Sequence, residues 1–199
     1  MSTKPQLTAN DYAYAAGLIG CDPKVLMAVA KIEAGGSGFL PSGEPRILFE
    51  AHKFDALTQG RFRKSHPHLS SRSWDRSLYS RGATADERGY GEHRRLAEAV
   101  KLDRLAALQA ASWGKFQILG ENFSAAGFNS LQAFINAMYK SELEHLLAFV
   151  HFVKAMRIDD ELRREDFDGF ARVYNGPAYR KNDYAGKMRA ELRRLRSIK

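Results

Sequence analysis

Apolar residues recur every three or four positions over most of the 199-residue chain. This spacing places them on one face of an amphipathic helix. The pattern predicts helices over about residues 9–20, 23–34, 93–110, 131–156, 167–175 and 183–199. A capping-box pattern at Ser141 indicates that the segment 131–156 is divided into two helices.

Two segments depart from the helical pattern. Residues 47–49, which read ILF after Pro45, predict a short strand. Residues 58–92 are poor in aliphatic side chains and rich in Arg, Ser, His and Gly, which predicts a long surface excursion with room for a small hairpin. Loops of this length within a compact domain are usually functional. The sequence therefore predicts a mainly α fold with a small β element, in one domain over residues 1–199.

Composition narrows the class of protein. The hydrophobic fraction of 44% is typical of a globular chain, and no apolar run approaches the length that spans a bilayer. The first residues lack the basic and then apolar layout of a secretory signal, which predicts a protein made in the cytoplasm. With Cys21 as its one cysteine, the chain has no internal disulfide, and we expect Cys21 to be a buried small hydrophobe.

The net charge of +8 indicates an anionic partner without choosing among candidates. Nucleic acid and an anionic cell envelope both fit, and a solvated basic surface is the plain alternative. The sequence contains no helix-turn-helix signature or paired-aromatic motif, so a basic helical nucleic-acid-binding module is the weaker hypothesis.

Glu33 is the first candidate for chemistry, because it ends an otherwise apolar helix. Apolar neighbours and the negative end of the helix dipole both raise the pKa of a carboxyl group. A carboxylic acid that stays protonated near neutral pH can donate a proton to a leaving oxygen. The alternative is a solvent-facing glutamate paired with Lys31 or Arg46.

Glu50 follows the predicted strand, a position from which a side chain can point into a cleft. A second carboxylate is the usual companion of a general acid in glycosidic hydrolysis, as base or nucleophile. A salt bridge from Glu50 to Arg46 or Lys53 is the competing interpretation.

Two further segments supply candidate binding residues. In the first, Ser112, Trp113 and Gln117 belong to a turn rich in aromatic residues and glycine, where the tryptophan can stack on a sugar and the glutamine can bind amide or hydroxyl groups. Trp113 as a core residue and Gln117 as a helix cap remain the alternative. In the second, Tyr174 and Asn175 end the 167–175 helix, and the tyrosine hydroxyl needs a partner such as a carboxyl group.

The sequence gives little support to a metal site or a phosphate-binding site. The six histidines form no HExxH motif and no zinc-spaced pair with a cysteine, so we expect no metal. The glycines at 35–38 follow a helix rather than open one, which disfavours a phosphate loop, and we expect no cofactor.

Four segments, read in order, resemble the N-acetylmuramidase family of phage endolysins. They are residues 31–36, 47–54, 111–120 and 170–177, which read KIEAGG, ILFEAHKF, ASWGKFQILG and FARVYNGP. The series also resembles, more distantly, the goose-type lysozymes and soluble lytic transglycosylases. The resemblance implies a lysozyme-like fold, a muramic-acid glycan substrate, Glu33 as the catalytic acid and lysis of bacteria by glycan cleavage.

The resemblance carries further expectations. We expect no separate wall-binding module, a monomer, and action on the cell wall after release from the host cytoplasm. A lytic transglycosylase, which needs only one catalytic carboxyl group and leaves anhydro ends, is the nearest alternative. A functional Glu50 would distinguish the hydrolase from it.

The predicted C-terminal helix is both amphipathic and basic. Its apolar stripe contains Tyr184, Met188, Leu192, Leu195 and Ile198, and its other faces carry arginines. Such a helix either docks on the core with solvated arginines or attracts the protein to an anionic envelope, and the two roles are compatible.

Overall fold

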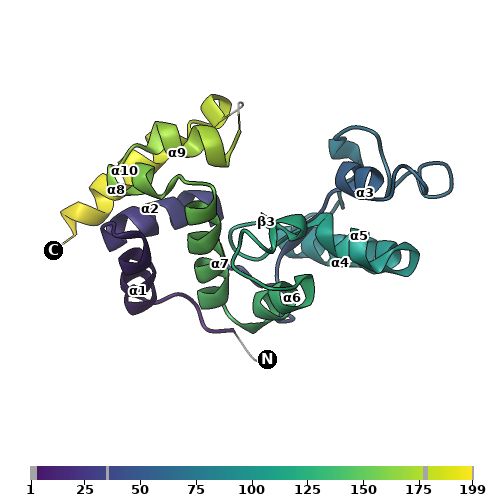
Figure 1. Ribbon diagram of the computed structural model, residues 1–199, viewed down its shortest axis with the longest axis horizontal. Coiled ribbons are helices and arrows are strands. Elements are labelled where there is room, and N and C mark those ends of the chain that lie inside the picture. Colours follow the sequence, from purple (N-terminus) through teal and green to yellow (C-terminus); the bar gives the residue numbers. More distant parts are fainter. Residues whose placement is uncertain (1–3, 35, 177–178, 199) are drawn as a thin grey trace.

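The fold is mainly helical with a small antiparallel sheet, as the sequence predicts (Figure 1). The computed structural model describes residues 4–34, 36–176 and 179–198. The helices are α1 (Ala9–Ile19), α2 (Pro23–Ala34), α3 (Ala51–Leu57), α4 (Ala85–Leu102), α5 (Arg104–Gln109), α6 (Leu131–Lys140), α7 (Glu142–Ala155), α8 (Asp159–Arg163), α9 (Phe167–Tyr174) and α10 (Tyr184–Ser197). Short 3₁₀ turns lie at η1 (Arg76–Leu78), η2 (Gly120–Asn122) and η3 (Tyr179–Asn182).

The sheet has three short strands in the order β1 (Ile47–Phe49), β2 (Ala111–Trp113) and β3 (Ile118–Leu119). Strand β1 pairs antiparallel with β2, with Ile47 opposite Trp113, and β2 pairs with β3 through a tight hairpin. The predicted strand at 47–49 is therefore confirmed. The second and third strands, which the sequence did not predict, flank the turn that it singled out at 112–117.

Helix ends follow the local capping chemistry. Thr8 and Asp11 form a capping box at the start of α1, and Ser141 caps α7, so the 131–156 segment is two helices as predicted. Asp183 likewise caps α10, as its side chain accepts a hydrogen bond from the backbone N–H of Gly186. No helix of the described residues is long and apolar enough to cross a membrane.

The segment 58–92 departs from its prediction. It contains no hairpin among its described residues, and α4 begins at Ala85 rather than at residue 93. Thr84 and Glu87 form a capping box that starts α4, a signal that the poor hydrophobic periodicity of this stretch concealed. The predicted helix 93–110 is also broken at Asp103, which caps α5.

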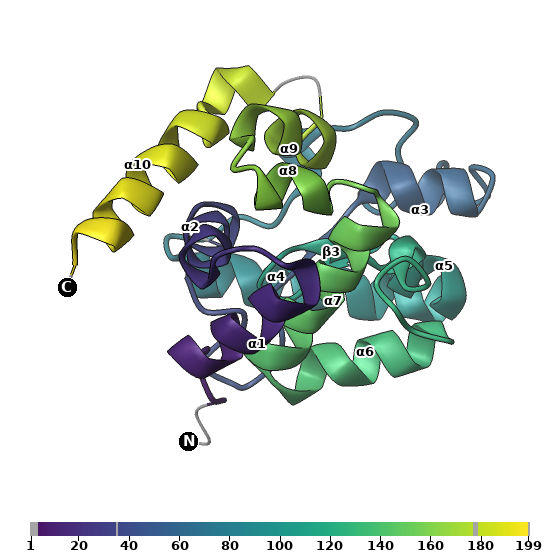
Figure 2. The same ribbon diagram turned by 60° about the vertical axis from the view of Figure 1, so that its left-hand side comes forward.

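The helices form two groups around the central helix α7 (Figure 1). Helices α1, α2, α8, α9 and α10 lie on one side, and α3, α4 and α5 lie with the sheet on the other. Helix α10 packs along α2 and α9, with Ala185, Met188 and Leu192 buried (Figure 2). The helix that carries Glu33 is therefore held in place by the C-terminal helix.

Candidate active site

A cleft of about 820 Å³ brings together the C-terminal end of α2, strand β1, the β2–β3 turn and the segment 76–92. Glu33, Ala34 and Ser37 line one part of it. Ile47, Leu48, Gly114, Lys115 and Gln117 line another. The segments that the sequence singled out around Glu33 and Gln117 thus meet at one surface.

Glu33 is half-buried in the last turn of α2 and faces the cleft. Its burial raises the pKa of the carboxyl group above the ordinary value, as the sequence predicts, while a hydrogen bond from Asn175 opposes part of that rise. Neither alternative ion pair of the sequence analysis forms among the described residues, since Arg46 pairs with Asp86 at 2.6 Å. Glu33 is thus a carboxylic acid that holds its proton to higher pH than an exposed glutamate.

Asn175 and Tyr174 reach the site from the end of α9 in different ways. Asn175 Nδ2 donates to Glu33 Oε1 at 2.8 Å. The Tyr174 hydroxyl donates to the Phe116 carbonyl at 3.0 Å, so its partner is a backbone oxygen rather than a carboxyl group. Its ring stacks on Phe170, with 5.2 Å between the ring centroids. Burial, and then the nearby charge of Glu33, raise the pKa of Tyr174.

Gln117 lies exposed in the cleft on the β2–β3 turn. Its backbone has a left-handed φ of 51°, and its Nε2 donates to the Gly114 carbonyl at 2.8 Å. The residue therefore caps no helix, and it lines the cleft.

Trp113 and Ser112 do not line this cleft. Trp113 is 1% exposed, and its indole N–H donates to the Leu108 carbonyl at 3.1 Å. Ser112 sits in the middle strand, between Leu48 and Leu119. The burial of Trp113 favours the core role that the sequence left open, and in this structure the side chain has no face on which a sugar can stack.

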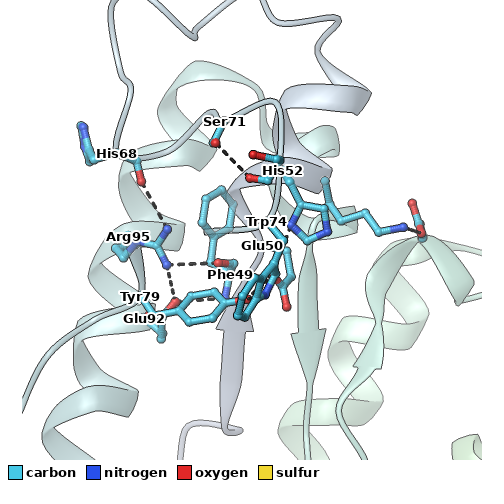
Figure 3. A network of polar contacts seen from close by, with 12 residues as sticks. Phe49, Glu50, His52, His68, Ser71, Trp74, Tyr79, Glu92 and Arg95 are labelled. Carbon is cyan, nitrogen blue, oxygen red and sulfur yellow. Dashed lines mark hydrogen bonds and ion pairs between the residues drawn. The ribbon is translucent and has the colours of Figure 1, made fainter. Parts of the chain in front are cut away.

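Glu50 directly follows β1 and precedes α3, at the strand end that the sequence predicts. Its carboxylate accepts a hydrogen bond from the Tyr79 hydroxyl at 2.6 Å and lies 3.4 Å from His52 Nδ1 (Figure 3). The expected alternatives do not form, because Lys53 pairs with Glu121 at 2.7 Å. Tyr79 lines the cleft, whereas Glu50 is not among the described lining residues.

Glu92 is a carboxylate in the cleft that sequence reasoning missed. It is 3% exposed, and both oxygens are occupied. Oε1 accepts from the Ser80 N–H at 2.6 Å, and Oε2 accepts from the Phe49 N–H at 3.0 Å and from Arg95 at 2.7 Å (Figure 3). Through these bonds Glu92 links α4 to β1 and to Ser80. Of the two acidic residues that line the cleft, Glu33 is therefore the one without a cationic partner among the described residues.

A buried polar cluster fixes the loop that follows Glu33. Glu142, 2% exposed on α7, accepts from the Gly38 N–H at 2.6 Å and pairs with Lys115 Nζ at 3.2 Å. His145 Nδ1 accepts from the Lys115 N–H at 3.0 Å. Burial lowers the pKa of His145, which keeps the ring neutral and able to accept.

The segment 71–84 contributes an aromatic pair, Trp74 and Tyr79. No sequence pattern singled out these two residues, and the length of the segment 58–92 was the only signal. Trp74 is 59% exposed, and its indole N–H donates to the Tyr79 hydroxyl at 2.6 Å. Tyr79 in turn donates to Glu50, and burial followed by this bond raises the pKa of its hydroxyl. Within the described residues, no three His, Cys, Asp or Glu side chains gather closely enough to hold a metal ion.

A partly buried carboxylic acid at a cleft, with a side-chain amide bonded to it, is typical of enzymes that cleave glycosidic bonds. The family model for N-acetylmuramidase matches residues 22–196, and the chain belongs to that family. The chain is 35% identical to the endolysin of the Burkholderia phage AP3, over 98% of this chain and 73% of that one. The crystal structure of that endolysin superposes on this structure with a TM-score of 0.86. None of the curated proteins searched matches the chain.

Proposed function

We propose that this chain is an endolysin that hydrolyses the bond between N-acetylmuramic acid and N-acetylglucosamine in peptidoglycan, with Glu33 as the general acid. The observation that carries the proposal is the raised pKa of a half-buried carboxyl group at a cleft large enough for several sugars. Membership of the N-acetylmuramidase family and the likeness to a phage endolysin support the same substrate class.

In the proposed mechanism Glu33 protonates the leaving glycosidic oxygen. Asn175 holds Glu33 Oε1, which leaves Oε2 to carry the proton into the cleft. Tyr174 supports this arrangement from the end of α9, because its hydroxyl ties the helix to the Phe116 carbonyl. Gln117 is placed to bind acetamido or hydroxyl groups of the glycan.

The stacking role expected of Trp113 falls instead, in this proposal, to Trp74. Its ring is exposed, and the hydrogen bond to Tyr79 fixes the orientation of its indole next to a lining residue of the cleft. An exposed and oriented aromatic face is what a sugar ring packs against.

The test of the reaction is mass spectrometry of digested peptidoglycan. We expect reduced muramic-acid ends after borohydride treatment. Anhydro ends would instead identify a lytic transglycosylase, and glucosamine ends a cut at the other bond. We expect Glu33→Gln to lose about 10²–10⁴-fold in turnover, since this is the contribution of a general acid. A folded variant that kept more than about a hundredth of wild-type turnover would remove Glu33 from this role.

Glu50 is proposed as the second carboxylate, which activates water or attacks the sugar. We expect Glu50→Gln to lose about 100-fold or more in kcat, because the glutamine cannot act as a base. Tyr79→Phe is the matched control, as it removes the hydroxyl that binds Glu50 but leaves the carboxylate. If both single variants and the double variant lost the same activity, Glu50 would act only by positioning Tyr79.

The remaining parts of the proposal concern the cell. We infer a monomer that reaches the cell wall after release from the host cytoplasm. The basic faces of α10 are proposed to assist binding to an anionic envelope.

A further inference from the structure

The cleft contains more positive charge than its own acids balance. Five basic side chains line it, and two of them are neutralised within the protein, since Arg46 pairs with Asp86 and Lys115 with Glu142. The other three are the exposed side chains of Arg76, Arg81 and Arg88, here called the arginine wall.

No acidic residue of the described chain pairs with the arginine wall. Arg88 Nη1 donates only to the Gly82 carbonyl, at 2.9 Å. Of the two acids of the cleft, Glu92 is already paired with Arg95, and Glu33 forms no ion pair with the arginine wall among the described residues.

Several arginines outside the cleft form ion pairs at 2.9 Å or less, and these are Arg61, Arg63, Arg163, Arg164, Arg189, Arg194 and Arg196. The distinguishing feature of the arginine wall is that its three cations, none of them paired with a carboxylate among the described residues, line one cleft together. Their joint field attracts an anion more strongly inside a cleft than on an open face.

The backbone that carries the arginine wall is anchored. The Ser80 N–H bonds to Glu92, the Tyr79 hydroxyl bonds to Glu50, and Asp75 caps the 3₁₀ turn in which Arg76 lies (Figure 3). Arg88 extends from the second turn of α4. Because the backbone is fixed in this way, little ordering of the segment is needed when an anion binds.

We propose that the arginine wall binds the carboxylates of the peptide stems that substitute muramic acid, so that the enzyme selects peptide-bearing glycan. This inference rests on the proposed function. The N-acetylated sugars of the backbone are neutral, whereas the stems carry free carboxylates beside the scissile bond. The planar guanidinium group matches a carboxylate with two parallel hydrogen bonds.

The experiment compares two soluble substrates of equal size. One consists of glycan fragments with intact stems, and the other of the same fragments after carbodiimide coupling of their carboxylates to methylamine. We expect wild-type kcat/KM to be about tenfold higher on the first, through KM, and this preference to shrink in high salt. The triple variant R76Q/R81Q/R88Q should lose the preference and cleave the methylamidated fragments as the wild type does.

The control is the triple variant K64Q/K101Q/K187Q, which removes the same charge from exposed positions outside the cleft. It should keep the preference, and equal losses in the two triple variants would reduce the effect to net charge and overturn the proposal. Equal cleavage of both substrates by the wild type would also overturn it. Single variants replace the triple variant if that protein does not fold. Failure of the proposed function looks different, because the wild type would then release no muramic-acid ends from either substrate.

Discussion

At the scale of single residues, burial and the contact with Asn175 together set the pKa of Glu33. Burial favours the neutral carboxyl group, and the amide of Asn175 favours the ionised one by donating to it. The pKa of Glu33 thus reflects two opposed influences, of which burial is the larger.

Removing the weaker influence gives a prediction with a definite sign. A general acid works while protonated, so activity falls as pH rises through its pKa. Asn175→Ala removes a bond that stabilises the carboxylate, so the pKa of Glu33 should rise and the alkaline limb of kcat/KM should move to higher pH. The matched control is Gln117→Ala, which changes a lining residue of the cleft that forms no hydrogen bond with Glu33 among the described residues. An alkaline limb that stayed in place or moved to lower pH in Asn175→Ala would contradict this account.

At the scale of elements, helix α7 supports the active site without entering it. Through Glu142 it holds the loop after α2, and through His145 it holds the β2–β3 turn. Glu142 and His145 both also contact Lys115, which lines the cleft and is largely buried against Glu142.

This support predicts an unequal cost for two ion pairs. Glu142→Gln leaves Lys115 without its carboxylate in a buried place, and we expect a loss of about 3 kcal/mol in the free energy of unfolding. The half-exposed pair of Lys53 and Glu121 is the matched control, and Glu121→Gln should cost less than about 1 kcal/mol. Urea unfolding of the three proteins measures both values. Similar losses in the two variants would show that burial does not decide the cost.

Helix α10 offers a prediction about the envelope. Its buried stripe docks on the protein, as one interpretation of the sequence holds. Arg194 pairs with Glu191, and Arg196 with Glu165 and Asp22, whereas Arg193 is exposed without a recorded acidic partner. Neutralising all three to glutamine should leave cleavage of soluble fragments intact and weaken binding to whole envelopes at low salt. Unchanged binding at low ionic strength would make these arginines ordinary surface charge.

Periodic elements of this chain were predictable and the segment 58–92 was not. The apolar spacing of α6, α7 and α9 and the cap at Ser141 are local signals, and the structure confirms them. The roles of Trp74, Tyr79 and Glu92 depend on contacts between distant segments, such as the bond from Tyr79 to Glu50. Contacts between distant segments leave no local pattern in a single sequence. The length of the segment 58–92 was therefore the only signal that it has a functional role.

At the scale of the whole molecule, the cleft joins two groups of helices with different tasks. The group with α2, α9 and α10 supplies the acid and its amide, and the other group supplies the sheet, the aromatic pair and the arginine wall (Figure 1). In our proposal the first group supplies the general acid, and the second supplies Glu50 and selects the substrate. Variants of Glu33 should therefore change kcat, whereas variants of the arginine wall should change mainly KM.

The contact between Glu33 and Asn175 also has a consequence for timing during synthesis. The two residues are 142 positions apart in the chain. At a translation rate of about 5–20 residues per second, the acid leaves the ribosome about 7–30 seconds before its amide partner, and α10 follows later still. A nascent chain thus contains α2 before α9 and α10, the helices that contact it or its Glu33, have been made. The enzyme therefore has its complete active site, with α10 packed on α2, only when the polypeptide has emerged almost to residue 197.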